Sequence, residues 1–188
     1  MLTIVPVSGE TLGLYNQIEN RYLVSELATV RVTRSGFSLE YTVLPQAQWR
    51  DYPDDEVFTA SELLKRRDAE CLFAFLDGVP VGQAVIVKNW NNLAMLWDLR
   101  VDTHHRRKGI GRELLAVCRD WAKSQGLQGI MLETQDTNPS ACQFYQNNGF
   151  VLGGVDRLLY GAMPHQVGKP MAFRETALFF YIMLNEAR

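Results

Sequence analysis

The sequence predicts an α/β protein built on a mixed, mostly antiparallel sheet of about six to seven strands that is flanked by helices. Two β-rich runs, CLFAFL and VGQAVIVKNW, are separated by Asp77-Gly78, a strong hairpin signal that implies antiparallel pairing. A near-continuous apolar run at residues 93–101 precedes a periodic helix and the strand GIMLET, and such a crossover implies one parallel pair. A chain of 188 residues suits one domain with a substantial core, so residues 1–188 are expected to form a single domain.

The first third of the chain carries weaker signals. Residues 11–24 have a rough apolar face at helical spacing, which predicts a first helix. FSLEYTVLP, at residues 37–45, alternates like a half-buried strand and ends at a proline. Residues 46–60 lack a clean period and carry acids among aromatics, which predicts either a solvated loop or a substrate-binding lid. ASELLKRRD then suggests a short helix.

Signals in the second half are stronger. Helical spacing is clearest from Ile110 to Ala122, and Gly126 supplies a C-terminal stop. After the strand GIMLET, Asn138-Pro139 provides an N-cap and a first helical position for a helix that ends at Gly149. Two further β-rich runs, FVLGGV and ALFFYIML, complete the predicted sheet.

Composition narrows the function classes. Lys and Arg total 19 against 21 Asp and Glu, a formal net charge of −2, which argues against a general nucleic-acid binder. The N-terminus lacks signal-peptide features and no apolar stretch approaches roughly 18 residues, so we expect a cytoplasmic protein without membrane contact. Three cysteines without C-x-x-C spacing suit reduced thiols, and no metal site is expected.

The segment HHRRKGIG, at residues 104–111, joins the central strand to the long helix. Free N–H groups and the positive end of the helix dipole meet at such a turn, which makes it an anion site. Gly109 and Gly111 permit close approach to the main chain. There is no G-x-x-x-x-G-K-[ST] motif, so the segment is not a P-loop. A dinucleotide fold would need glycine or alanine at Leu114, so the two glycines alone are weak support for that fold. Positive charge comes from Arg106, Arg107, Lys108 and Arg112.

Arg106-x-x-Gly109-x-Gly111 follows a strand ending LRV and precedes a second strand and NPSACQFYQNNGF. Together these motifs resemble the GNAT superfamily of N-acetyltransferases over residues 93–160, with R-x-x-G-x-G as the loop for the acyl-CoA pyrophosphate. The resemblance implies acetyl-CoA as co-substrate, bound at the parallel pair of strands. The cofactor-binding residues it implies are Leu99, Arg100, Val101, Arg106, Arg107, Lys108, Gly109, Ile110, Gly111, Arg112, Asn138, Ala141 and Tyr145.

Tyr145 matches the tyrosine whose hydroxyl meets the CoA sulfur, which implies a catalytic role. A tyrosine with a pKa of ~10 protonates a thiolate of pKa ~8.5 uphill by roughly 2 kcal/mol, so hydrogen-bond stabilisation of the leaving sulfur is the expected role. Asn138 matches a position near the thioester. Two alternatives stay open, with Tyr145 as a core side chain and Asn138 as a helix cap only.

The acceptor amine is expected to face a carboxylate. Deprotonating an alkyl ammonium of pKa ~10.4 at pH 7 costs about 4.6 kcal/mol unless a base or desolvation helps. Asp98 interrupts an apolar strand beside the implied pantetheine-binding residues, and Glu133 does the same on the neighbouring strand. We expect Asp98 first, and Glu133 second, as base or orienter of the amine. An ion pair between Asp98 and Arg100 is the alternative.

Within the superfamily, the chain is similar to the streptothricin acetyltransferases, antibiotic-resistance enzymes that acetylate the β-lysine amine of streptothricin. The similarity lies in VRVTRSGFSLEYTVLP, YPDDE, KNWNN and LGGVDRLLYG. The acids in and near these motifs suit a cationic small-molecule acceptor. The loop at residues 163–175 is longer than the fold requires and leaves the exact acceptor open. The acceptor-binding residues implied are Asp54, Asp55, Glu56, Trp90, Asp98, Glu133, Asp156 and Tyr160.

Two other functions remain open at the level of sequence. One is acetylation of a protein lysine, a peptide N-terminus or a polyamine, and the other is non-catalytic binding of acyl-CoA. The choice between monomer and homodimer is also open, because an edge strand such as ALFFYIML can pair within or between chains.

Overall fold

The computed structural model describes residues 1–52, 58–163, 166–169 and 175–184. Their contacts group into two compact units. The first unit comprises Met1–Arg21, Asp51–Ile130 and Met183–Arg188, and the second comprises Tyr22–Arg50 and Met131–Ile182. The single domain expected over residues 1–188 stays a prediction. Within the described residues, no helix has the length and apolarity needed to cross a membrane.

Four antiparallel strands form the sheet of the first unit, in the order β1-β4-β5-β6. The predicted hairpin is present, and Asp77 and Gly78 have φ values of 50° and 83°, the left-handed backbone that a tight two-residue turn requires. Most of β5 is buried, as a central strand should be. The strands are β1 (Leu2–Pro6), β4 (Ala69–Leu76), β5 (Val79–Lys88) and β6 (Ala94–Val101).

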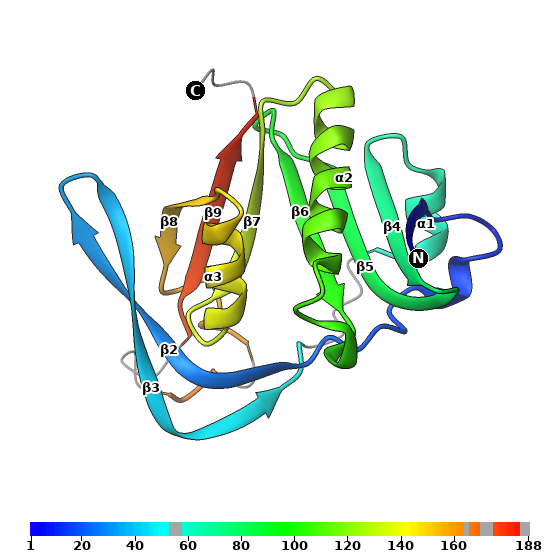
Figure 1. The fold of residues 1–188 in the computed structure, drawn as a ribbon. Coiled ribbons are helices and arrows are strands. Elements are labelled where there is room, and N and C mark those ends of the chain that lie inside the picture. Colours follow the sequence, from blue (N-terminus) through cyan, green and yellow to red (C-terminus); the bar gives the residue numbers. More distant parts are fainter. Residues whose placement is uncertain (53–57, 164–165, 170–174, 185–188) are drawn as a thin grey trace. The chain divides into compact units, whose positions relative to one another are not determined.

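The predicted long helix is α2 (Ile110–Ser124), which lies across β5 and β6 (Figure 1). Leu114 and Leu115 on its inner face are fully buried. Gly82 of β5 permits this packing, because a Cβ there would lie 3.0 Å from Leu114 Cδ1. The remaining short helices of this unit are η1 (Leu12–Leu14), α1 (Ala60–Lys65) and η2 (Thr103–His105).

The described residues of the second unit form a long hairpin, three further strands and one helix. The predicted N-cap is confirmed, since the Asn138 side chain accepts a hydrogen bond from Ala141 N at 3.2 Å. Gly149, with φ of 85°, follows the end of that helix. The elements are β2 (Tyr22–Thr33), β3 (Gly36–Arg50), β7 (Gly129–Gln135), α3 (Pro139–Asn147), β8 (Val151–Asp156) and β9 (Ala177–Met183).

The predicted fold class is confirmed. Seven strands form one sheet in the order β1-β4-β5-β6-β7-β9-β8, and β2 and β3 form a separate two-stranded sheet. The seven-stranded sheet is mostly antiparallel, with β6 and β7 as the parallel pair that the crossover predicted.

The helix predicted over residues 11–24 is wrong. The structure has only the short turn η1 there, and β2 begins at Tyr22. Asn16 has a φ of 61°, a left-handed conformation that an α-helix cannot contain. The apolar residues that gave helical spacing therefore belong to a turn, a connecting segment and a strand.

The predicted loop over residues 46–60 is wrong in its first part, because β3 continues to Arg50. Pro45 does not end the strand, because the register between β2 and β3 shifts beside it: Val24 pairs with Gln48, but Glu26 pairs with Val43. Such an irregularity tolerates a proline, since no ladder N–H is required there. Residues 53–57 of the predicted loop lie outside the described part of the chain.

Candidate functional site

The turn before α2 has the backbone expected of an anion site. Arg107 and Gly109 both have positive φ, 64° and 86°, and Gly109 is the N-cap residue of α2. Left-handed residues within a turn direct successive N–H groups toward one concavity, where an anion binds. Asp102 fixes the start of the turn, because its Oδ1 accepts a hydrogen bond from His104 N at 3.0 Å and lies 2.8 Å from His105 Nδ1.

The four cations of this turn divide into two groups. Arg107, Lys108 and Arg112 are exposed, as side chains that meet a bound anion should be. Arg106 instead binds main-chain carbonyl groups: its Nε donates to Val101 O at 2.8 Å and its Nη2 to Arg21 O at 2.5 Å. Burial lowers the pKa of Arg106. The guanidinium of Arg106 therefore ties the turn to the rest of the first unit.

A connecting segment, residues 16–21, lies against the strand and turn that sequence implicates in cofactor binding; we call it the strap. Asn16 N donates to Gln83 Oε1 at 2.9 Å. Arg100 Nη1 donates to Ile18 O at 3.4 Å, and Thr103 Oγ1 donates to Glu19 Oε2 at 2.9 Å. These three hydrogen bonds hold the strap against β5, β6 and the start of the turn before α2.

Asp98 is part of this network. Arg100 Nε donates to both of its carboxylate oxygens, at 3.0 and 2.9 Å, and Gln83 Nε2 donates at 2.7 Å. Burial raises the pKa of Asp98, and Arg100 and Gln83 oppose that rise. The ion pair that sequence left as the alternative is thus the observed arrangement, and the role of Asp98 as a base stays a prediction.

In the second unit, Glu133 of β7 and Tyr160 are in contact, with the Tyr160 hydroxyl donating to Glu133 Oε1, and their predicted role in acceptor binding stays a prediction. Asp156 at the end of β8 shapes the turn that carries Tyr160, because its Oδ1 accepts from Leu158 N at 2.7 Å and Leu159 N at 3.0 Å. Burial raises the pKa of Glu133, the Tyr160 hydrogen bond lowers it, and the negative charge of Asp156 raises it. The result is a partly buried carboxylate that holds its proton more tightly than an ordinary glutamate.

Tyr145 lies in an aromatic cluster of the second unit. Its ring centroid is 5.6 Å from that of Phe150 and 6.2 Å from that of Phe180, and the residue is buried. Its ring therefore packs in the core, as one of the two sequence interpretations expected. A core ring fixes the direction of the hydroxyl, so this packing is compatible with a catalytic role.

Some predicted site residues are not brought together with the others. Trp90 is 92% exposed in the turn between β5 and β6, at the opposite end of β6 from the anion turn. Asp54, Asp55 and Glu56 lie outside the described residues, and their role in acceptor binding stays a prediction.

Sequence reasoning missed a polar network in the second unit. Arg50 Nη1 donates to Glu175 Oε1, the two forming an ion pair, and Thr137 Oγ1 lies 3.5 Å from the same oxygen. The Tyr22 hydroxyl lies 3.5 Å from Thr137 Oγ1. Gln83 of the first unit was also missed, although a glutamine inside the buried run VGQAVIV was an available signal.

Residues 34–150 match the model of the Acetyltransferase (GNAT) family. The chain belongs to the GNAT acetyltransferase family. It is therefore an acetyl-CoA-dependent N-acetyltransferase, as the sequence motifs implied.

Several of the similar proteins are described as streptothricin acetyltransferases. A streptothricin acetyltransferase of Escherichia coli is 33% identical over 181 residues, 96% of this chain and 94% of that protein. Streptothricin acetyltransferase A of Bacillus subtilis (strain 168) is 36% identical over 133 residues, 71% of this chain and 72% of that protein. A crystal structure assigned as a streptothricin acetyltransferase from Bacillus anthracis str. Ames, in complex with acetyl coenzyme A, matches with a TM-score of 0.87 and 28% identity, covering 98% of this chain and 100% of that chain. The resemblance stated from sequence is confirmed.

Proposed function

We propose that this GNAT enzyme acetylates a primary amine of a basic small molecule, the β-lysine amine of streptothricin, and so confers resistance to that antibiotic. Its similarity to the Escherichia coli streptothricin acetyltransferase along nearly the whole of both chains carries the proposal. Glu133 and Asp156, two partly buried acids of the second unit, support the proposed acceptor because negative side chains suit a cationic molecule. Three free, buried cysteines accord with action in the reducing cytoplasm.

We propose that the turn before α2 holds the pyrophosphate of acetyl-CoA. The main-chain N–H groups from Arg107 to Gly111 and the N-terminus of α2 supply the donors. The exposed side chains of Arg107, Lys108 and Arg112 supply positive charge. Ile110 contributes through its backbone alone, because its side chain is only 3% exposed.

We propose Glu133 as the carboxylate that faces the acceptor amine. Its raised pKa suits a proton acceptor better than an ordinary glutamate, because a base works best when its pKa approaches the working pH. Asp98 is less suited, since its two oxygens already accept bonds from Arg100 and Gln83. We therefore assign Asp98 to positioning of the strap and of β6.

The proposed reaction is a direct transfer. The amine nitrogen bonds to the acetyl carbonyl carbon, its proton passes to Glu133, and the carbon–sulfur bond breaks. The sulfur leaves as a thiolate that the Tyr145 hydroxyl stabilises by a hydrogen bond and that later takes up a proton. This route needs no other co-reactant than the amine and acetyl-CoA.

The experiment is a thiol-release assay with purified protein, acetyl-CoA and a panel of acceptors: streptothricin, spermidine and lysine peptides. The expected result is turnover with streptothricin at a kcat/KM at least about a hundredfold above that of the other acceptors, a gap of roughly 2.7 kcal/mol in transition-state stabilisation. Turnover on peptides or spermidine without turnover on streptothricin would replace the proposed acceptor. Tight binding of CoA with no thiol release on any acceptor would favour a binding module.

A further inference from the structure

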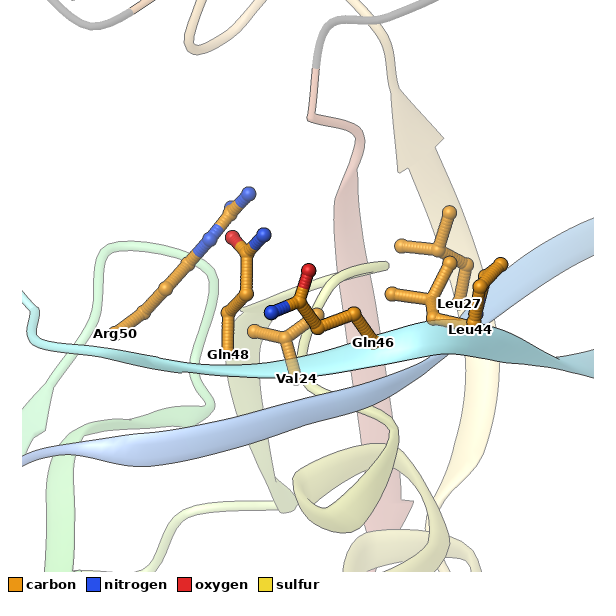
Figure 2. Close-up of a pocket in the computed structure, with 7 residues that line it drawn as sticks. Val24, Leu27, Leu44, Gln46, Gln48 and Arg50 are labelled. Carbon is orange, nitrogen blue, oxygen red and sulfur yellow. The ribbon is translucent and has the colours of Figure 1, made fainter.

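The hairpin β2–β3 carries a hollow of about 400 Å³ that no predicted site residue lines. Figure 2 shows Gln46, Gln48 and Arg50 projecting from the same face of β3, as alternate residues of a strand do. Leu27 and Leu44 gather at one end of the hollow, and Val24 lies between them and Arg50. This volume is within the range of about 300–1,000 Å³ typical of small-molecule sites.

The lining offers hydrogen bonds and apolar contact but little net charge. The Arg50 side chain is 36% exposed and its charge is paired with Glu175, whose side chain is 10% exposed. Gln46 and Gln48 are exposed, and each amide can both donate and accept. Val24 is 2% exposed and forms an apolar floor. Such a surface suits an uncharged amide- or hydroxyl-bearing group better than an ammonium or a carboxylate.

Contacts within the second unit connect this hollow to the predicted catalytic residues. Arg50 binds Glu175, and Glu175 lies 3.5 Å from Thr137 Oγ1. Thr137 directly precedes Asn138, the N-cap of the helix that carries Tyr145. On the other side, Ala177, two residues after Glu175, pairs with Asp156, whose charge acts on Glu133. The hollow therefore neighbours the elements that hold the proposed base.

We infer that this hollow is a second acceptor subsite, which takes an uncharged amide- or hydroxyl-bearing part of the acceptor while the amine to be acetylated lies at Glu133. The inference rests on the proposed function, because it places one part of the acceptor in the hollow and the reacting amine at Glu133. Gln46 and Gln48 supply the hydrogen bonds of the subsite, and the Arg50–Glu175 pair fixes its inner wall. The subsite distinguishes the whole antibiotic from a fragment that carries the amine alone.

The test compares the double variant Gln46→Leu/Gln48→Leu with the parent enzyme. Leucine keeps the approximate size of glutamine and removes its hydrogen bonds, so KM for streptothricin should rise about tenfold. The KM for acetyl-CoA and the kcat/KM for free β-lysine should stay within about twofold. Gln125→Leu, at an exposed glutamine after α2, is the matched control and should change none of these values.

The outcomes separate the two proposals. A parent enzyme that does not acetylate streptothricin would overturn the proposed function and the subsite with it. A parent enzyme that does, together with an unchanged KM for streptothricin in the double variant, would overturn the subsite alone. An equal rise in KM for streptothricin and acetyl-CoA would also overturn it, because that result reports a general disturbance of the fold.

Discussion

Asp98 and Arg100, two residues apart on β6, form an ion pair in which the guanidinium Nε donates to both carboxylate oxygens, at 3.0 and 2.9 Å. Their side chains are only 19% and 14% exposed. Arg100 also reaches Ile18 of the strap, and Gln83 binds both Asp98 and Asn16. Asp98 therefore helps to hold the strap against β6, whose C-terminal end the resemblance implicates in binding acetyl-CoA.

Asp98→Asn should behave as a loss of positioning. The amide keeps the shape of the side chain but leaves Arg100 without its counter-charge, which should cost about 2–3 kcal/mol and lower Tm by roughly 5–10 °C. KM for acetyl-CoA should rise, while the pH dependence of kcat stays as in the parent enzyme. Thermal melts and steady-state kinetics across pH check this. A loss of the acidic limb of the pH profile in this variant would instead make Asp98 the base.

Glu133 should determine the pH at which kcat/KM falls on the acidic side of the pH profile. Burial raises its pKa, so it stays protonated to a higher pH than an ordinary glutamate, and the base becomes available only above that pKa. Tyr160→Phe removes the donor that lowers this pKa, so the limb of kcat/KM should move to higher pH. Glu133→Gln should lower kcat by about 10²–10⁴-fold. The acceptor amine also titrates, but its effect on the pH profile is the same for the parent enzyme and for every variant.

The control for Tyr160→Phe is Tyr41→Phe, which removes a hydroxyl that donates to Gln146 at 2.8 Å in the same unit. Its pH profile should match that of the parent enzyme. If the acidic limb stays in place in Tyr160→Phe, or moves equally in both variants, Glu133 is not the group that the limb reports.

Gly109→Ala should weaken binding of acetyl-CoA. Gly109 has a φ of 86°, and alanine in that conformation costs about 1–2 kcal/mol. If the turn relaxes to relieve this strain, its N–H groups lose their common direction, and Kd for acetyl-CoA should rise about 5–30-fold. Titration calorimetry measures it. Gly126→Ala is matched, because Gly126 has a φ of 70° and, like Gly109, open space for a Cβ. Gly126→Ala should lose about as much stability as Gly109→Ala but keep the Kd of the parent enzyme for acetyl-CoA. An equal rise in Kd in both variants would contradict the assignment of the turn before α2 to acetyl-CoA.

The cysteines should be unreactive in the folded enzyme. Burial raises the pKa values of Cys71, Cys118 and Cys142 to about 12, so at pH 8 only about one thiol in 10⁴ is a thiolate. A disulfide reagent such as Ellman's should react with all three only after denaturation. Rapid reaction of the native protein would show that at least one thiol is accessible.

Sequence predicted well the parts of the fold that local chemistry dictates. Asp77-Gly78 requires a tight turn, Asn138-Pro139 begins a helix, and the apolar period from Ile110 onward fits a single buried stripe. Tyr160 and Glu133, both among the acceptor-binding residues that the resemblance implies, are in contact in the structure, and their binding role stays a prediction.

Sequence-based prediction failed where contacts between residues distant in the chain determine the structure. Residues 11–24 have apolar positions that fit a helix, but pairing of β2 with β3 draws Tyr22–Thr33 into a strand. The side chains of Arg106, Arg100 and Gln83 each bind one main-chain group of the strap, 67 to 85 residues away in sequence. No local pattern indicates that these polar groups bind one segment. The sequence therefore could not distinguish Arg106, which binds the strap, from the exposed cations of the same turn.

The most direct measurement of the central claim is the product formed from streptothricin and acetyl-CoA by the parent enzyme, analysed by fragmentation mass spectrometry. The account predicts one added acetyl group, located on the β-lysine amine and formed with one free thiol per acetyl transferred. Glu133→Gln should form this product about 10²–10⁴-fold more slowly. Streptothricin left unmodified while a peptide or polyamine in the same mixture is acetylated would contradict it.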